Sequence, residues 1–220
     1  MKLIFSILAV LGCASAQFNE TAQHNIVQAH NDLRSDIARG IFRASGRLLP
    51  QAANMKEMTW DPELAESAQD YADTCSKSPS GHPNIGENIY LDHTESSDSL
   101  DGLGVRAAKH WARQFEDYRG TSSMVDQASL LNGLASATQM AWADAEFVGC
   151  GVQKCGRDPA QPNMYIFSVV CHYKEPESLF FSRMYAPGRM CSACPCGYTC
   201  DTKPDCAYGL QMTEKFCSLK

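Results

Sequence analysis

The side chains best able to do chemistry in this sequence are its eleven cysteines. Six of them crowd into the C-terminal part of the chain, at Cys191, Cys194, Cys196, Cys200, Cys206 and Cys217. The Cys-x-x-Cys-x-Cys spacing that opens this group is one that zinc-binding thiolates can use, but the same thiols can pair as disulfides. The redox state of the compartment selects between these two outcomes.

The N-terminal segment predicts export to an oxidising compartment. Lys2 gives a cationic start, residues 3–11 form an apolar run too short to span a bilayer, and Ala14-Ser15-Ala16 has the form of a cleavage site. We expect a signal peptide over residues 1–16 and a secreted, extracellular mature protein. Loss of Cys13 leaves an even number of cysteines, which predicts about five disulfides and no zinc in the C-terminal group.

The charge of the chain limits its partners. The sequence holds 25 acidic side chains against 19 basic ones, and its lysines and arginines form no cluster along the chain. We therefore expect neither nucleic acid nor anionic lipid headgroups as the main partner. No segment after the signal peptide holds eighteen consecutive apolar residues, so membrane insertion is not expected.

Four stretches have the spacing of helices whose apolar side chains share one face. The first begins near Ala22 and the second at Asp61-Pro62, where aspartate can cap the helix and proline suits its first position. We expect Gly120 to end the third helix. The four inward stripes are Ile26, His30, Leu33, Ile37 and Ile41; Leu64, Ala68, Tyr71 and Cys75; Ala108, Trp111, Phe115 and Tyr118; and Leu134, Ala137 and Ala141.

Strands are predicted over residues 87–90, 147–152 and 164–173, and the Ser/Asp-rich stretch 94–102 is predicted to be a loop. Helices mixed with few strands, without a βαβ repeat, predict an α+β domain with helices around a small antiparallel sheet. We place this domain in residues 17–176. Residues 177–220 are too rich in cysteine, proline and glycine for a core of their own, and we expect a short cross-linked tail.

Five motifs, in order, resemble the CAP superfamily, which groups cysteine-rich secretory proteins, wasp antigen 5 and plant pathogenesis-related proteins. They are His30-Asn31-Asp32-Leu33-Arg34, Gly86-Glu87-Asn88-Ile89-Tyr90, Thr138-Gln139-Met140-Ala141-Trp142, Phe147-Val148-Gly149-Cys150-Gly151 and Val170-Cys171-His172-Tyr173. The C-terminal cysteines resemble the hinge of single-domain nematode members, the Ancylostoma-secreted or venom-allergen-like proteins. The resemblance implies a three-layer αβα sandwich with a disulfide-rich hinge tail. It also implies the disulfides Cys75–Cys155 and Cys150–Cys171, and leaves the pairing of the tail open.

Many CAP proteins hold two histidines and two glutamates in a central cavity, and some bind zinc or magnesium there. The resemblance places His82 and Glu87 at the first histidine and the first glutamate. Gln114 stands where the second glutamate belongs, and Ser136 where the second histidine belongs. A set with two ligands missing rarely holds zinc, so we expect a cavity remnant with a His82–Glu87 hydrogen bond, no metal and no cofactor. His93 and His110 stay open as alternative neighbours of this cavity.

The same residues could be read as a hydrolase, with Ser136 as nucleophile beside His82 and Glu87. A nucleophilic serine needs a base within hydrogen-bond reach and an oxyanion hole, and the sequence has no Gly-x-Ser-x-Gly motif. We expect no catalytic site. His30 is predicted to be a buried, hydrogen-bonded helix residue, and His172 to pack within its strand.

Two short motifs bear on contacts with other molecules. Asn19-Glu20-Thr21 is an N-glycosylation sequon, and we expect a glycan on Asn19. Arg119-Gly120-Thr121 is similar to an integrin-binding tripeptide but lacks the aspartate that supplies a carboxylate to the receptor's metal. Any integrin binding is therefore expected through another surface.

The resemblance implies a binding protein that acts on host cells, as hookworm inhibitors of platelets and neutrophils do by targeting integrins. In its single-domain form and size, the chain is most similar to the platelet inhibitors. The expected partner is a host cell-surface receptor, with an integrin as the leading candidate. The alternative is a carrier, since some members bind sterols or fatty acids between helices. A channel-toxin role is less favoured, because the tail is short and its cysteine spacing differs.

Overall fold

The computed structural model describes residues 18–95, 100–120, 122–124, 133–175, 182–194, 198–200 and 217–219. The expected signal peptide and most of the cysteine-rich tail, with Cys196 and Cys206, lie outside the described residues. The helices are α1 (Glu20–Ala38), α2 (Pro62–Asp73), α3 (Leu103–Arg113) and α5 (Ala135–Ala141), with single 3₁₀ turns η1 (Leu100–Gly102) and η2 (Gln114–Glu116). The strands are β1 (Arg43–Ala44), β2 (Arg47–Leu48), β3 (Thr59–Trp60), β4 (Ile85–Thr94), β5 (Phe147–Arg157), β6 (Tyr165–Lys174), β7 (Tyr198–Cys200) and β8 (Cys217–Leu219).

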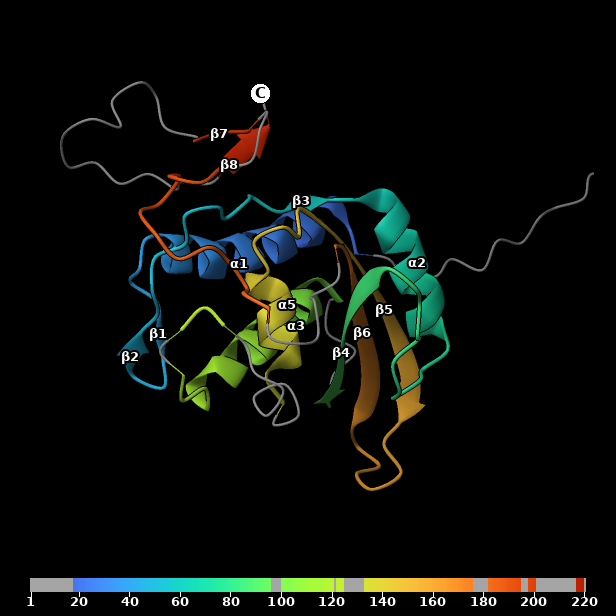
Figure 1. Cartoon of the computed structure of the whole chain (residues 1–220). Coiled ribbons are helices and arrows are strands. Elements are labelled where there is room, and N and C mark those ends of the chain that lie inside the picture. Colours follow the sequence, from blue (N-terminus) through green and yellow to red (C-terminus); the bar gives the residue numbers. More distant parts are fainter. Residues whose placement is uncertain are drawn as a thin grey trace, which may run out of the picture.

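The central sheet has the strand order β3-β5-β6-β4, and helices cover both of its faces. Helix α2 packs on one face against β5 and β6, while α1, α3 and α5 gather on the other (Figure 1). This is the three-layer αβα sandwich that the resemblance implies. The pairs β4–β6 and β5–β6 are antiparallel, as expected, but the two-residue strand β3 pairs with β5 in parallel.

Two glycines let α2 lie against the sheet. A Cβ atom on Gly149 would stand 2.1 Å from the backbone nitrogen of Ala65, and one on Gly151 would stand 2.4 Å from the Cα of Gln69. Such distances are far below van der Waals contact, so these positions accept only glycine. The Gly-Cys-Gly motif of β5 therefore has a physical reason, since its two glycines face α2 while Cys150 between them faces the other way.

The start of each of the first two helices is capped by a side chain. Asn19 accepts a hydrogen bond from the backbone nitrogen of Ala22 at 2.9 Å, and Asp61 accepts from those of Glu63 and Leu64. The cap at Asp61 is the one that the sequence predicts. The α1 helix ends at Ala38, and the chain turns at Gly40, whose φ is +69°. The prediction that Ile41 continues the buried stripe is therefore wrong, and this side chain is 50% exposed.

The third helix is shorter than predicted. Regular α-helix stops at Arg113, and the chain tightens into η2 before Phe115 and Tyr118, which are buried as expected. Gly120 does not end the helix. It lies against the Tyr118 ring, where a Cβ would stand 2.2 Å from the hydroxyl oxygen. The glycine is needed for this close approach and not for a helix cap.

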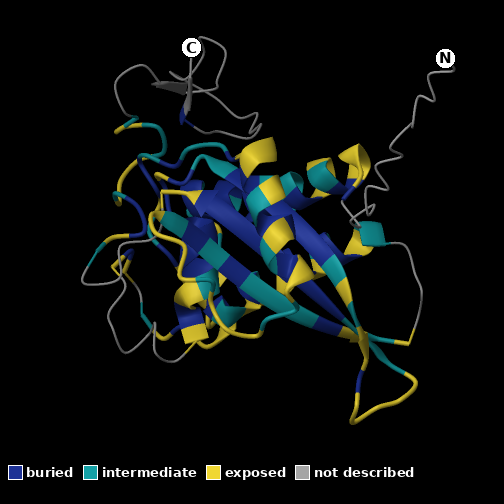
Figure 2. Ribbon diagram, turned by 90° about the vertical axis from the view of Figure 1, so that its right-hand side faces the viewer, coloured by how far each residue is buried: buried dark blue, intermediate teal, exposed yellow. Residues whose placement is uncertain are grey.

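The main core fills the space between the sheet and the layer of α1, α3 and α5. Figure 2 shows buried residues running along the sheet and the inner sides of the helices, with exposed residues at the outer helix faces and loop ends. Ile26, Trp111, Met140 and Val169 are all less than 2% exposed. None of the helices among the described residues is both long and apolar enough to cross a membrane.

Disulfides occur in both the domain and its tail. Cys75 bonds to Cys155 and Cys150 to Cys171, which are the two pairs that the resemblance implies. In the tail, whose pairing the sequence leaves open, Cys194 bonds to Cys217. The backbone nitrogen of Cys217 also donates to the carbonyl oxygen of Met55 at 2.8 Å, so β8 is tied to the main domain.

Candidate functional site

The four predicted cavity residues lie on two different faces of the sheet. Neighbouring side chains of a strand point to opposite faces. On β4, Glu87 points toward α2, whereas Asn88 points toward the layer of α1, α3 and α5. There the Asn88 amide donates to the carbonyl oxygen of Ser136 at 3.1 Å, and the Gln114 side chain accepts from the backbone nitrogen of Ala137 at 2.9 Å. His82 is exposed on the loop before β4.

Glu87 is paired with a histidine other than the one expected. Its Oε2 accepts from Nε2 of His172 at 3.0 Å, and its Oε1 accepts from the backbone nitrogen of Ser80 at 2.8 Å. His82 lies farther off, with its ring 6.0 Å from that of His172. The expected His82–Glu87 hydrogen bond is therefore replaced by one from the strand histidine, because Glu87 and His172 stand directly opposite each other on β4 and β6.

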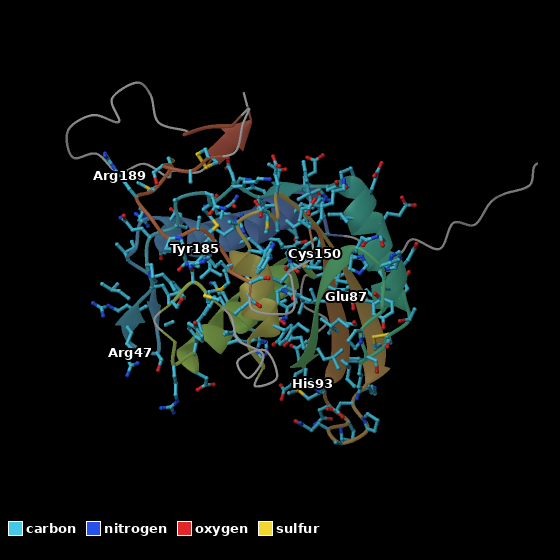
Figure 3. The ribbon with its side chains drawn as sticks, in the orientation of Figure 1. Arg47, Glu87, His93, Cys150, Tyr185 and Arg189 are labelled. Atoms are coloured by element: carbon cyan, nitrogen blue, oxygen red, sulfur yellow. A yellow bond between two sulfur atoms is a disulfide. The ribbon has the colours of Figure 1, made fainter. Side chains whose placement is uncertain are left out.

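A third side chain completes this group. Ser67 on α2 lies 3.0 Å from Nδ1 of His172, so the hydroxyl can donate to the ring while the opposite nitrogen donates to Glu87. His172 has no exposed side-chain surface and Glu87 keeps 9%. Burial by itself would raise the pKa of Glu87, but the hydrogen bonds from His172 and Ser80 outweigh it and lower that pKa. Figure 3 labels Glu87 within the sheet region beside α2.

Ser67, His172 and Glu87 are connected in the order that serine hydrolases use, so catalysis has to be considered. Ser67 lies within α2, where the backbone N–H groups around it bond to carbonyl oxygens one turn earlier and cannot form an oxyanion hole. The cleft beside Ser67, about 360 Å³, is also lined by the carboxylates Glu63, Glu66 and Asp70. Developing negative charge on a substrate would be repelled there, so the geometry supports a structural link between α2 and the sheet.

A second hydrogen-bond chain runs through the opposite side of the sheet. Asn88 donates to the Tyr173 hydroxyl at 3.0 Å, Tyr173 donates to Nε2 of His30 at 2.9 Å, and Nδ1 of His30 donates to the carbonyl oxygen of Ile26 at 2.8 Å. Burial lowers the pKa of His30 to about 4 and raises that of Tyr173. His30 is thus buried and hydrogen-bonded, as the sequence predicts, and neutral at physiological pH.

The arginine of the His-Asn-Asp-Leu-Arg motif is a fully buried clamp. The Arg34 guanidinium donates to the carbonyl oxygens of Lys56, Met140, Trp142 and Ala143, at 2.7 to 3.1 Å. Burial lowers the pKa of Arg34 to about 9, so it is still charged at neutral pH. This side chain joins α1 to the end of α5 and to the segment before β3. The sequence reasoning did not single it out, because amphipathic spacing says nothing about a buried charge.

The cavity residues in the described part of the chain do not fit a zinc site. Among the described residues, no three histidine, cysteine, aspartate or glutamate side chains are grouped so that they could hold a metal ion. Glu87 is already engaged by His172 and Ser80, and Gln114 by the backbone of Ala137. The alternative neighbours are also elsewhere, since His93 pairs with Asp158 at 2.8 Å and the His110 ring lies 4.7 Å from that of Tyr90.

A separate cleft opens between the start of α1 and the start of α2. It measures about 350 Å³. Its lining combines the apolar residues Phe18, Trp60, Pro62, Ala65 and Cys150 with polar surface that includes Gln23 and Glu66. The sequence did not indicate this cleft, because its walls come from segments far apart in the chain.

The model of the cysteine-rich secretory protein family, CAP, matches residues 27–173. The chain belongs to the CAP family. Bovine (Bos taurus) peptidase inhibitor 16 is 32% identical over 88% of this chain, and venom allergen 5 of Tityus serrulatus is 31% identical over 84%. This CAP chain spans only 38% and 46% of the lengths of those two relatives. It spans 73% of venom allergen 5 of Vespula maculifrons, with 32% identity over 69% of this chain.

Solved CAP structures have the same fold. The crystal structure of NaASP2 with Zn²⁺ has a TM-score of 0.72 and 26% identity, covering 82% of this chain and 93% of that one. Na-ASP-1 has a TM-score of 0.73 and 27% identity, covering 86% of this chain and 47% of that one. The hookworm platelet inhibitor, at 22% identity and a TM-score of 0.64, covering 84% of this chain and 88% of that one, shares the fold alone. In this CAP chain, hydrogen bonds of His172, Ser67 and Arg34 tie α1, α2 and α5 to their neighbours. Of the three, only His172 has a signal in the sequence, because side chains alternate along β4 and β6 and the pairing of these strands puts it on the same face as Glu87.

Proposed function

We propose that this CAP chain is a secreted extracellular protein that modulates host cells by binding, and that it blocks the adhesion of platelets or leukocytes at their integrins. The binding role is supported by the hydrogen bonds that the buried acidic and histidine side chains already make within the fold. Glu87 is held by His172 and Ser80, and His30 by Tyr173, so these groups serve packing. A surface-binding role makes no demand on the interior, which is consistent with the altered cavity positions Gln114 and Ser136.

The integrin part of this proposal is supported by the resemblance of the motifs and of the C-terminal cysteines to nematode members. It is tested with protein secreted from eukaryotic cells, disulfides intact, added to washed platelets and neutrophils on fibrinogen and on collagen. Dose-dependent inhibition that survives removal of the glycan is expected. No effect at micromolar concentration would exclude this receptor class on these cells.

The proposal includes the processing of the chain, with cleavage after residue 16 and a glycan on Asn19. Asn19 is exposed, and its Nδ2 donates to Asp101 at 2.8 Å. A glycosylated amide keeps one N–H, so this hydrogen bond and the helix cap are both compatible with the modification. Mass spectrometry of the secreted protein before and after glycosidase treatment tests both points.

Carriage of a small lipid is the second candidate, supported by the cleft between α1 and α2. Its volume of about 350 Å³ and its lining by Phe18, Trp60 and Pro62 suit a short apolar chain. Binding of a fluorescent fatty acid should quench or shift Trp60 emission and be lost in Trp60→Ala. Binding that persists in this variant would place the lipid elsewhere.

A further inference from the structure

The hairpin of β1 and β2 is a rigid projection at the edge of the molecule (Figure 1). Its turn residues Ser45 and Gly46 have φ of +46° and +76°, the pattern of a two-residue type I′ turn that matches the twist of the strands. The Ser45 backbone nitrogen donates to the carbonyl oxygen of Phe115 at 3.0 Å, and the rings of Phe42 and Phe115 meet edge to face at 5.4 Å. Contacts with Phe115 therefore fix the hairpin on the domain. Binding through it would cost little conformational entropy, because the hairpin is already ordered.

Alternation along the hairpin separates an inner face from an outer one. Ala44 and Leu49 are buried against the domain. Arg43 and Leu48 take the opposite side, since they pair with each other across the strands. Arg47 pairs with Ala44 and so starts from the inner side, but its side chain is exposed and reaches the edge of the hairpin beside Arg119. Ile41 is 50% exposed and Leu48 49%, and they are two of the three large apolar side chains that are exposed among the described residues. Exposed apolar side chains on a rigid element are typical of contact surfaces.

The hairpin is also positively charged on a protein that is acidic as a whole. The formal charge of the chain is −6, yet residues 37–56 hold no aspartate or glutamate. Arg43 and Arg47 each donate to a backbone oxygen, Arg43 to that of Gly46 and Arg47 to that of Arg119. That second bond brings Arg119 alongside, and Figure 3 shows Arg47 at the outer edge of the molecule. Within the described residues, none of these three arginines forms an ion pair with a carboxylate, Glu116 and Asp117 of the neighbouring segment included.

We propose that the exposed residues Ile41, Arg43 and Leu48, with Arg47 and Arg119 at the edge of the hairpin, form the surface through which this chain docks on an acidic protein surface. Arginines beside aliphatic side chains suit carboxylates next to an apolar group, and arginine is enriched at protein interfaces. A sulfated polysaccharide offers anions but no apolar side chains to cover Ile41 and Leu48. The acidic remainder of the chain repels such a partner and orients it toward the hairpin. This inference rests on the proposed binding function and names the surface that performs it.

The test uses the full secreted chain and two immobilised probes, a random copolymer of glutamate and tyrosine and heparin. The double variant Arg43→Glu/Arg47→Glu is compared with Lys77→Glu/Lys109→Glu, which changes the charge equally at exposed positions elsewhere. Binding to the copolymer should fall at least about tenfold in the hairpin variant and less than about threefold in the control. Leu48→Ser, which leaves the charge unchanged, should also weaken binding to the copolymer. Unchanged melting temperatures check that each variant is folded.

Three results would overturn the inference: no binding of the wild type to the copolymer, equal losses in the two charge variants, or tighter binding to heparin than to the copolymer. Cell adhesion separates this inference from the proposed function. If the wild type and the hairpin variant inhibit adhesion equally, the function stands and the hairpin is not its surface. If the wild type leaves the cells unaffected but holds the copolymer through the hairpin, the integrin proposal fails and the docking surface stands.

Discussion

Replacing Glu87 by glutamine tests whether the buried Ser67–His172–Glu87 group holds α2 to the sheet. The carboxylate accepts two hydrogen bonds, from His172 at 3.0 Å and from the Ser80 backbone nitrogen at 2.8 Å. Hydrogen bonds to a charged group contribute about 1.5–3 kcal/mol each. Glutamine keeps one acceptor oxygen, and its NH₂ group can donate to His172 only if the imidazole changes tautomer. The expected net loss is therefore about 2 kcal/mol, less than the sum of the two bonds.

The loss should depend on pH in a defined direction. The pKa of Glu87 is lowered below its ordinary value of 4.5, so the folded state favours the charged carboxylate. Its stabilisation is complete above that ordinary value and disappears as the pH falls through the lower value of the folded protein. The difference between wild type and Glu87→Gln should thus be about 2 kcal/mol at pH 7 and shrink between pH 5 and pH 3.

The assay is urea unfolding of the disulfide-bonded protein at several pH values, with Glu66→Gln as the control. Glu66 is exposed on the same helix, and the same substitution there should change the free energy of unfolding by less than about 0.5 kcal/mol. In thermal unfolding, 2 kcal/mol corresponds to a fall of about 4–8 °C for a domain of this size. Equal stabilities of the two variants at pH 7, or a difference that does not change with pH, would refute this account of the buried group.

Three other perturbations have defined outcomes. Arg34→Met should lower the free energy of unfolding, measured with urea, by about 3–5 kcal/mol, because it leaves four buried carbonyl oxygens without their donor. Arg34→Lys should recover part of this loss. A loss below about 1 kcal/mol in Arg34→Met would contradict the role of Arg34 as a clamp. Because the pKa of His30 is about 4 in the folded state and 6.5 ordinarily, the folded protein should lose about 3 kcal/mol as the pH falls from 6.5 to 4, a loss absent in His30→Gln. A fluorophosphonate probe should not label Ser67, as mass spectrometry of the treated protein can show; covalent labelling there would restore a hydrolase hypothesis.

Much of the fold is predictable from local signals. The cap at Asp61 with Pro62 behind it marks the start of α2, and the runs of β-branched and aromatic residues mark β5 and β6, because these patterns depend on neighbours only a few residues away. The errors fall where a long-range contact changes the local outcome. Ile41 has the spacing of the α1 stripe, but the chain has already turned at Gly40. Gly120 has the form of a helix end, but it serves the packing of Tyr118.

The candidate site was harder to predict, because the partners of its side chains come from distant segments. His82 lies five residues before Glu87 in the sequence, yet the hydrogen-bond partner of Glu87 is His172. The register of β4 on β6 places Glu87 and His172 directly opposite each other. Nothing near Ser67 in the sequence indicates that it would complete the group. The arginines near the β1–β2 hairpin were also not predicted to form a group, because Arg119 is far from Arg47 in the sequence and lies beside it only in the fold.

The sequence by itself determined the family, through motifs that keep their order, and the layered fold that comes with it. It also determined the positions of most helices and strands, whose causes are local. The tertiary structure decided which side chains meet. It places Glu87 against α2 and not against Gln114, and it buries Arg34 among carbonyl oxygens. It also brings the arginines of the β1–β2 hairpin together on a protein that is acidic as a whole. The physical reason is that hydrogen bonds and ion pairs act over a few ångströms in space, whatever the separation along the chain.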